Sequence, residues 1–266
     1  MAYTTIDDPS EYFQAITYTG NSNTSHAVTN TGNSNLQPDW IWVKIRTGQN
    51  DDHILVDSSR GNLKRLKSNQ NYSEPSDAAE IKSFDSNGFT LGTTDGTSNY
   101  NGFTYVAWQW KANGGTTTTN DASSTGVGTI DSVYQANTTA GFSIVTWTGT
   151  GSAGTIAHGL GTTPSIIIVK NRDESQSWII GSNQLTNYEH IIKLNDTGTV
   201  STSSNKFNST APNSTVFSVG TGVATNGSSD KVIAYCFSDV KGYSKIGSYT
   251  GNGNADGAFV YTGFKP

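Results

Sequence analysis

The sequence has little charge, a single cysteine and only six prolines. Charged residues make up 14% of its 266 residues and the net charge is −5, so no basic excess is available to bind phosphates by counterion release. We therefore expect no nucleic-acid partner. Because Cys236 has no second cysteine to pair with, an intramolecular disulfide is excluded.

Long apolar runs are also missing. No stretch approaches the 18 apolar residues of a membrane-spanning helix, and residues 1–9 have neither the basic nor the apolar region of a secretory signal. We expect a soluble protein that is not exported by a cleaved signal and is not inserted into a membrane. The length suits two domains of ordinary size.

No catalytic, metal or phosphate motif stands out, so we expect no enzyme, no cofactor and no metal. The four histidines lack the spacing of a zinc site. The Asp51-Asp52 pair could offer oxygen ligands, but the periodic spacing of a calcium loop is absent, and a solvated turn is the favoured interpretation. Acids such as Asp173-Glu174 and Asp131 fall in turn or linker positions, which disfavours the paired carboxylates of a glycosidase.

The polar part of the sequence consists mainly of serine, threonine, asparagine and glycine, and aromatic residues make up 11% of the chain. Glycine and asparagine serve tight turns, whereas threonine, valine and aromatics suit a half-buried pleated surface. Apolar residues alternate in short bursts between Gly/Asn/Ser/Thr clusters, which is typical of an all-β sandwich. Disorder is the alternative, but disordered chains lack such bursts.

The bursts repeat along the chain. Thr-Tyr-Thr-Gly at 17–20 recurs as Thr-Trp-Thr-Gly at 146–149 and as Ser-Tyr-Thr-Gly at 248–251. Residues 38–46 match a segment that starts 126 residues later (Pro38 to Pro164), and residues 105–110 match one 127 residues later (Tyr105 to Val232). We infer two diverged copies of one antiparallel jelly-roll or lectin-like β-sandwich and the start of a third.

The repeat predicts five segments. They are an N-terminal attachment segment (1–11), a first sandwich (12–111), a polar and flexible linker (112–130), a second sandwich (131–240) and a partial third repeat forming a β-hairpin (241–266). An unstructured tail is an equally weighted alternative for residues 1–11.

Alternation also predicts which faces are buried, since every second side chain of a strand lies on one face. The sequence favours a core face of large residues, which places Cys236 on the opposite face as an ordinary strand residue. The predicted core residues are Val106, Trp108 and Trp110 in the first copy, and Ile233, Tyr235 and Phe237 in the second.

Aromatic rings can stack on sugars, and carboxylates can hydrogen-bond sugar hydroxyls. Because Tyr18, Trp147 and Tyr249 hold one position in all three copies, a core role is favoured for them over a binding role. The strand with Trp40 and Trp42 is apolar on both faces, so one face is available to a neighbouring subunit or domain. The candidate ligand-binding residues are Trp40, Trp42, Trp178, Asp51 and Asp52.

Several strings of the sequence resemble a repeated module of tailed-bacteriophage virion proteins, of the tail-fibre-like or receptor-binding-like type found in marine phages and cyanophages. The resemblance covers nearly the whole chain and implies a virion-surface role with a lectin-like fold, without supplying binding residues. The strings are residues 84–92, 105–111, 141–151, 158–164, 169–172 and 247–253.

The resemblance implies a homotrimeric fibre or adhesin that is made in the host cytoplasm and lies on the virion surface. Its expected partners are other virion proteins and a host cell-surface glycan. Two alternatives remain open. One is a purely structural virion component, such as a capsid decoration or head fibre. The other, less favoured because no catalytic domain is present, is a carbohydrate-binding module of a cellular enzyme.

Overall fold

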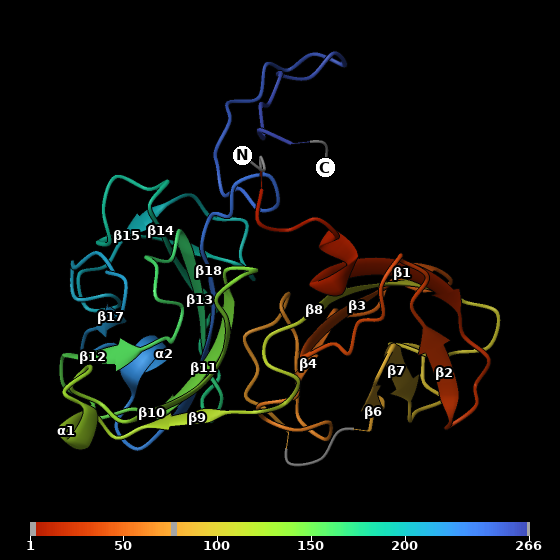
Figure 1. The fold of residues 1–266 in the computed structure, drawn as a ribbon, viewed down its shortest axis with the longest axis horizontal. Coiled ribbons are helices and arrows are strands. Elements are labelled where there is room, and N and C mark those ends of the chain that lie inside the picture. Colours follow the sequence, from red (N-terminus) through yellow and green to blue (C-terminus); the bar gives the residue numbers. More distant parts are fainter. Residues whose placement is uncertain (1–3, 76–78, 265–266) are drawn as a thin grey trace.

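A computed structural model describes residues 4–75 and 79–264. The described chain is almost entirely strand, turn and loop, and its named strands pair antiparallel throughout. The prediction of an all-β, sandwich-type fold is therefore confirmed. Two sandwiches lie beside each other, and the last part of the chain extends away from both (Figure 1).

The first sandwich packs a five-stranded sheet against a three-stranded sheet. A short 3-10 helix, Pro9–Glu11, precedes the first strand. The five-stranded sheet has the order β1 (Phe13–Thr19), β8 (Thr104–Trp110), β3 (Trp40–Thr47), β4 (Ile54–Asp57) and β5 (Arg65–Leu66). The three-stranded sheet has the order β2 (His26–Thr29), β7 (Gly88–Leu91) and β6 (Ile81–Asp85).

The second sandwich has an eight-stranded sheet and a two-stranded sheet. The larger sheet has the order β16 (Ser201–Thr202), β15 (His190–Lys193), β14 (Ile179–Ser182), β13 (Ile166–Asn171), β18 (Lys231–Phe237), β11 (Phe142–Thr148), β10 (Ser132–Asn137) and β9 (Thr118–Asn120). The smaller sheet pairs β12 (Gly154–Ala157) with β17 (Val216–Val219), and two one-turn helices, α1 (Ala122–Thr125) and α2 (Val223–Asn226), lie in loops.

The same strand order recurs in both sandwiches. The order β1-β8-β3-β4-β5 of the first has its counterpart in β11-β18-β13-β14-β15 of the second. The repeated motifs supply β1 and β11, and the matched segments supply β3 with β13 and β8 with β18. The sequence similarity thus extends to topology.

The prediction of the core face was wrong. The first core is filled from β8 by Tyr105 and Ala107, and the second from β18 by Val232, Ala234 and Cys236. The large residues that were predicted to fill these cores lie on the other face of the same strands. On β18 that face packs against the other sandwich, which buries Ile233 and Tyr235 fully and Phe237 partly.

The two large sheets therefore pack against each other through aromatic and aliphatic side chains. Trp40 of β3 stacks on Tyr235 of β18, with ring centroids 4.1 Å apart and planes 15° from parallel. Burial of this many large side chains stabilises the pair by the hydrophobic effect, at about 1.5–3 kcal/mol for each side chain that is fully buried. The fully buried members are Trp40, Leu55, Leu66, Ala112, Phe142, Ile144, Trp178, Ile233 and Tyr235.

An ionic network crosses the same interface. Arg60 of the first sandwich pairs with Asp57 and Glu74, each at 2.6 Å, and Arg172 of the second sandwich pairs with Glu74 at 2.7 Å. The Tyr235 hydroxyl donates to Asp57 at 2.7 Å. Burial acts to raise the pKa of Glu74, but hydrogen bonds and charge from Arg172 and Arg60 hold it below its ordinary value. The carboxylate therefore stays ionised within the interface.

The segment 112–130, expected to be a flexible linker, contacts the first sandwich at its start and joins the sheet of the second sandwich further along. The buried carboxylate of Asp39 accepts backbone N–H bonds from Ala112, Gly114 and Gly115, at 2.7 to 2.9 Å. Further along, β9 joins the eight-stranded sheet and α1 begins at a capping aspartate, Asp121. The polar composition reflects turns and caps rather than freedom of motion.

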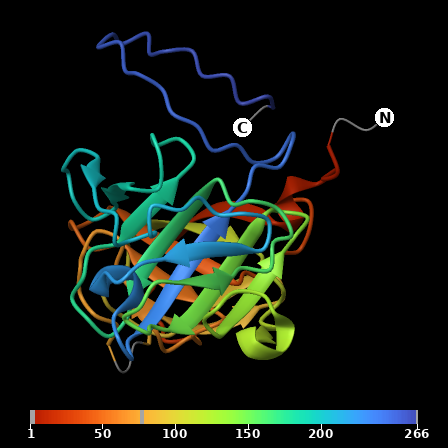
Figure 2. The ribbon, with the colours of Figure 1, turned by 90° about the vertical axis from the view of Figure 1, so that its left-hand side faces the viewer.

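The described part of the expected third repeat, residues 241–264, forms no strand and so no β-hairpin. It leaves the second sandwich after a tight turn closed by the Val240–Ser244 bridge, then runs outward and back (Figure 2). We call residues 246–264 the arm. Its aromatic side chains Tyr249, Phe259 and Tyr261 are 72%, 90% and 78% exposed. A core role thus holds for Trp147 but not for Tyr249, which has no sheet beneath it.

Within the described residues, no helix has the length and apolar character needed to cross a membrane.

Candidate functional site

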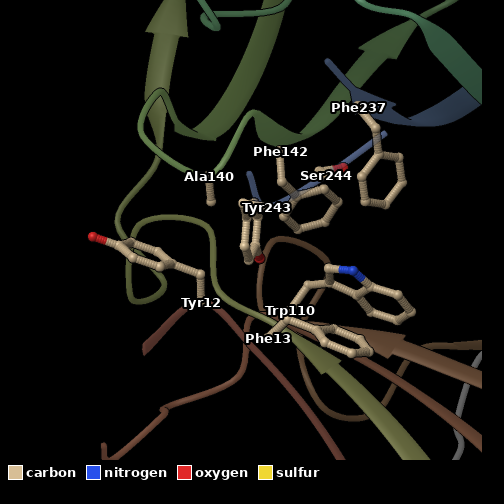
Figure 3. Close-up of a pocket in the computed structure, with 8 residues that line it drawn as sticks. All are labelled: Tyr12, Phe13, Trp110, Ala140, Phe142, Phe237, Tyr243 and Ser244. Atoms are coloured by element: carbon tan, nitrogen blue, oxygen red, sulfur yellow. The ribbon is translucent and has the colours of Figure 1, made fainter. Parts of the chain in front are cut away.

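An aromatic crevice of about 180 Å³ opens where the two sandwiches meet, at the end of the interface nearest the arm (Figure 3). We call this site the junction crevice. The first sandwich contributes residues at the start of β1 and the end of β8, and the second contributes residues at the start of β11, at the end of β18 and in the turn that follows it. The lining residues are Tyr12, Phe13, Trp110, Ala140, Phe142, Phe237, Tyr243 and Ser244.

Strand register places these rings in pairs. Phe13 lies opposite Trp110 across β1 and β8, with centroids 5.0 Å apart, and Phe142 lies opposite Phe237 across β11 and β18, at 4.8 Å. Trp40 packs beneath, 4.6 Å from Trp110. Each sandwich therefore contributes one aromatic pair from equivalent strand ends, and the pairs face each other across the junction (Figure 3).

The crevice has neutral polar groups and no charged lining residue. Tyr12 and Tyr243 meet edge to face at 6.2 Å, where burial raises the pKa of Tyr243 and neighbouring Tyr12 adds to the effect. Burial likewise raises the pKa of Tyr12, with a contribution from Glu11. Both hydroxyls therefore stay protonated at neutral pH and can donate a hydrogen bond.

The candidate tryptophans are not brought together in an open site. Trp40 is 1% exposed and Trp178 0%, both between the sandwiches, and Trp178 donates its indole N–H to the Lys67 carbonyl of the first sandwich at 2.9 Å. Neither ring can therefore stack on a ligand. Trp42 is half-buried and donates to His53 Nδ1 at 2.8 Å.

The candidate aspartates make local contacts. Asp52 accepts from Lys67, Asn69 and Gln70 at 2.7 to 2.9 Å. Partial burial acts to raise its pKa, but these hydrogen bonds and the lysine charge lower it to about 2. Asp51 accepts from the Gln49 amide at 2.8 Å. The pair orders a loop at the end of β3, and Lys67 links it to the interface, because the same residue accepts from Trp178 through its carbonyl.

Two further groups that chemistry could use, Cys236 and His158, are buried. Burial raises the pKa of the Cys236 thiol to about 12, against a small opposing effect of Ser143, so a reactive thiolate is disfavoured. Burial lowers the pKa of His158 to about 4. Its Nδ1 accepts from Leu160 N–H at 3.2 Å, and its Nε2 lies 3.1 Å from the Asn213 carbonyl. Both ring nitrogens therefore have a hydrogen-bond partner while the ring is neutral.

Across the described ranges, no three His, Cys, Asp or Glu side chains gather in a way that could hold a metal ion. The arrangement at the junction crevice is suited to binding an apolar or amphipathic ring, because its lining is aromatic with a few neutral polar groups at the rim.

Sequence reasoning missed the junction crevice as a site. Trp110 and Phe237 were assigned to sandwich cores, and Tyr12, Phe13 and Phe142 were not singled out as binding residues. A signal was present, since the first strand of each copy begins with phenylalanine and the last ends with an aromatic residue. Reading it requires knowing that the copies pack through these faces.

No curated protein and no solved structure matches the chain. A family model does match, over residues 8–266, and so covers both sandwiches and the arm. The chain belongs to the family described as a domain of unknown function, DUF7483.

Proposed function

We propose that this protein is a non-catalytic component of a bacteriophage virion surface that recognises a host-surface carbohydrate, and that the junction crevice takes one sugar ring. The observation that carries the proposal is the crevice itself, an open aromatic site formed by two sandwiches. The sequence resemblance to phage surface modules supports the virion part of the proposal.

The crevice suits a neutral sugar in size and chemistry. Its 180 Å³ lies below the roughly 300–1,000 Å³ of pockets that enclose drug-sized ligands, which limits the occupant to about one ring. The C–H face of a pyranose packs on flat aromatic rings, while tyrosine and serine hydroxyls can exchange hydrogen bonds with its hydroxyl groups. The absence of a charged lining residue favours a neutral sugar over an acidic one.

A glycan array probed with the purified protein tests this. Tyr12 lies at the rim, and Tyr12→Ala should reduce binding about tenfold, the loss expected when one stacking contact of about 1–1.5 kcal/mol is removed. Tyr72→Ala is the matched control, because Tyr72 is an exposed tyrosine of the first sandwich outside the crevice. Absence of binding to every glycan, or equal loss in both variants, would refute the assignment.

A second candidate, a structural virion component, is favoured by the arm. The arm exposes three consecutive large apolar side chains, Phe259, Val260 and Tyr261, and exposed apolar patches mark contact surfaces for other proteins. In this proposal the arm contacts other virion proteins or further copies in a trimer, and the two sandwiches act as a spacer. Gold-labelled antibody against the protein, imaged on intact particles by electron microscopy, separates capsid from tail. Sedimentation velocity measures whether the purified protein is a trimer.

A further inference from the structure

A second pocket, of about 350 Å³, lies on the second sandwich and has the opposite character to the junction crevice. It is formed by β14 and the loop before it, by β15 and β16, by the loop that follows β16, and by α2. Figure 1 shows β14, β15 and α2 on the part of the second sandwich away from the first. We call it the lysine pocket. Its lining residues are Gln176, Ser177, Ile179, Ile191, Lys193, Ser201, Thr202, Ser203, Lys206 and Ala224.

The pocket has an apolar floor and polar walls. Ile179, Ile191 and Ala224 are buried members of the sandwich core and form the floor. The side chains of 201–203, with Gln176 and Ser177, supply hydroxyl and amide groups around it. These groups can both donate and accept hydrogen bonds, as a hydroxylated ligand requires.

Two lysines give the pocket its charge. Lys193 pairs loosely with Asp196 at 3.7 Å and both side chains are close to half exposed. Lys206 is half-buried, and in the part of the chain that the structure describes no acidic group lies within ion-pair distance of it. Burial lowers the pKa of Lys206, and the positive charge of Lys193 lowers it further.

The backbone around Lys206 is fixed in place. Its N–H donates to the Ser203 carbonyl at 3.3 Å, and its carbonyl accepts from Gly220 N–H at 3.1 Å and from the Thr225 hydroxyl at 3.0 Å. The next residue, Phe207, is fully buried against the core. A half-buried ammonium without a counterion is therefore held beside a second one, an arrangement that an anionic ligand would stabilise.

We propose that the lysine pocket binds the anionic group of an acidic saccharide, a carboxylate or a sulfate, with the sugar ring over the apolar floor. This inference rests on the proposed carbohydrate recognition and assigns it a second, acidic subsite, distinct from the neutral junction crevice. Lys206 and Lys193 contact the anion, and the hydroxyls of 201–203 contact the ring.

Titration of the full-length protein by amide NMR tests the pocket with three probes: glucuronic acid, glucose and inorganic sulfate. Glucuronic acid should shift the amides of 201–206, glucose should not, and sulfate should compete with glucuronic acid for the same amides. A response to glucose equal to that of glucuronic acid, or failure of sulfate to compete, would overturn the proposal.

Variants identify the cation. Lys206→Met should weaken glucuronic acid binding about tenfold or more, the loss typical of one charge-assisted hydrogen bond, and Lys206→Arg should retain most of it. Lys82→Met is the matched control, because Lys82 is a surface lysine of the first sandwich that donates to the Ser25 hydroxyl. Unchanged binding by Lys206→Met would overturn the proposal. Loss of glucose binding in Tyr12→Ala, but not in Lys206→Met, would show that binding at the junction crevice is independent of the lysine pocket. The two proposals can therefore be tested separately.

Discussion

Trp40→Ala is expected to uncouple the two sandwiches. Trp40 is fully buried at the interface, stacks on Tyr235 and also contacts Trp110 and Phe142. Truncating a buried tryptophan costs about 3–5 kcal/mol, from lost burial and the cavity left behind. For a chain of this size that corresponds to a fall in Tm of roughly 10 °C.

Differential scanning calorimetry measures both the size of the effect and its nature. If the interface couples the sandwiches, wild type unfolds in one transition, and Trp40→Ala should broaden or split it. Trp42→Ala is the matched control, since this half-buried neighbour on the same strand should cost only about 1–2 kcal/mol. A Trp40→Ala transition that stays single and shifts no more than that of Trp42→Ala would refute the reasoning.

Three further predictions follow from the same structure. The pKa of His158 is about 4 in the folded protein, against 6.5 ordinarily, so the neutral ring stabilises the fold fully above pH 6.5. About 3 kcal/mol of unfolding free energy should be lost as pH falls from 6.5 to 4. His158→Gln should reduce this pH dependence of the unfolding free energy, measured by urea titration across the same range. Glu74→Gln, which leaves the buried Arg60 and the partly buried Arg172 without their shared carboxylate, should cost about 3–5 kcal/mol at pH 7 by urea unfolding. Because the pKa of Glu74 is lowered in the folded protein, wild type should lose the stabilisation from this ionised carboxylate only as pH falls below 4.5. Replacing Tyr249, Phe259 and Tyr261 together by serine should change the unfolding free energy by less than about 0.5 kcal/mol per site, since the rings are exposed, while reducing any self-association seen by sedimentation.

The fold class could be predicted from the sequence because its signals are local. Alternation of apolar residues and turn chemistry depend on neighbouring residues, and the repeat of residues 17–20 at 146–149 is visible without any structure. The strand that contains Trp108 and Trp110 was also recognised correctly as a strand. The sequence did not show which face of each strand packs inside its own sandwich and which packs against the other sandwich.

That error has a physical cause. Alternation shows that two faces differ, but when both are apolar it does not show which lies inside the sandwich and which lies against another sheet. Size was a misleading guide, because β8 and β18 place Ala107 and Ala234 in the sandwich cores, whereas the larger Tyr235 of β18 lies at the junction between the sandwiches. Trp40 and Trp178 were proposed as ligand-binding residues, but both lie between the sandwiches; the expectation that one face of the Trp40–Trp42 strand contacts a neighbouring domain is confirmed by the stacking of Trp40 on Tyr235.

The junction crevice is a property of the pair of sandwiches. Phe13 and Trp110 come from one copy, Phe142 and Phe237 from equivalent positions of the other, and their spacing depends on how the large sheets pack. Trp40→Ala should therefore weaken carbohydrate binding at the junction crevice while leaving the lysine pocket intact, because the lysine pocket lies within the second sandwich alone. Glucose and glucuronic acid titrations of that variant would show this difference. Equal loss at both sites would mean that the second sandwich depends on the first for its own fold.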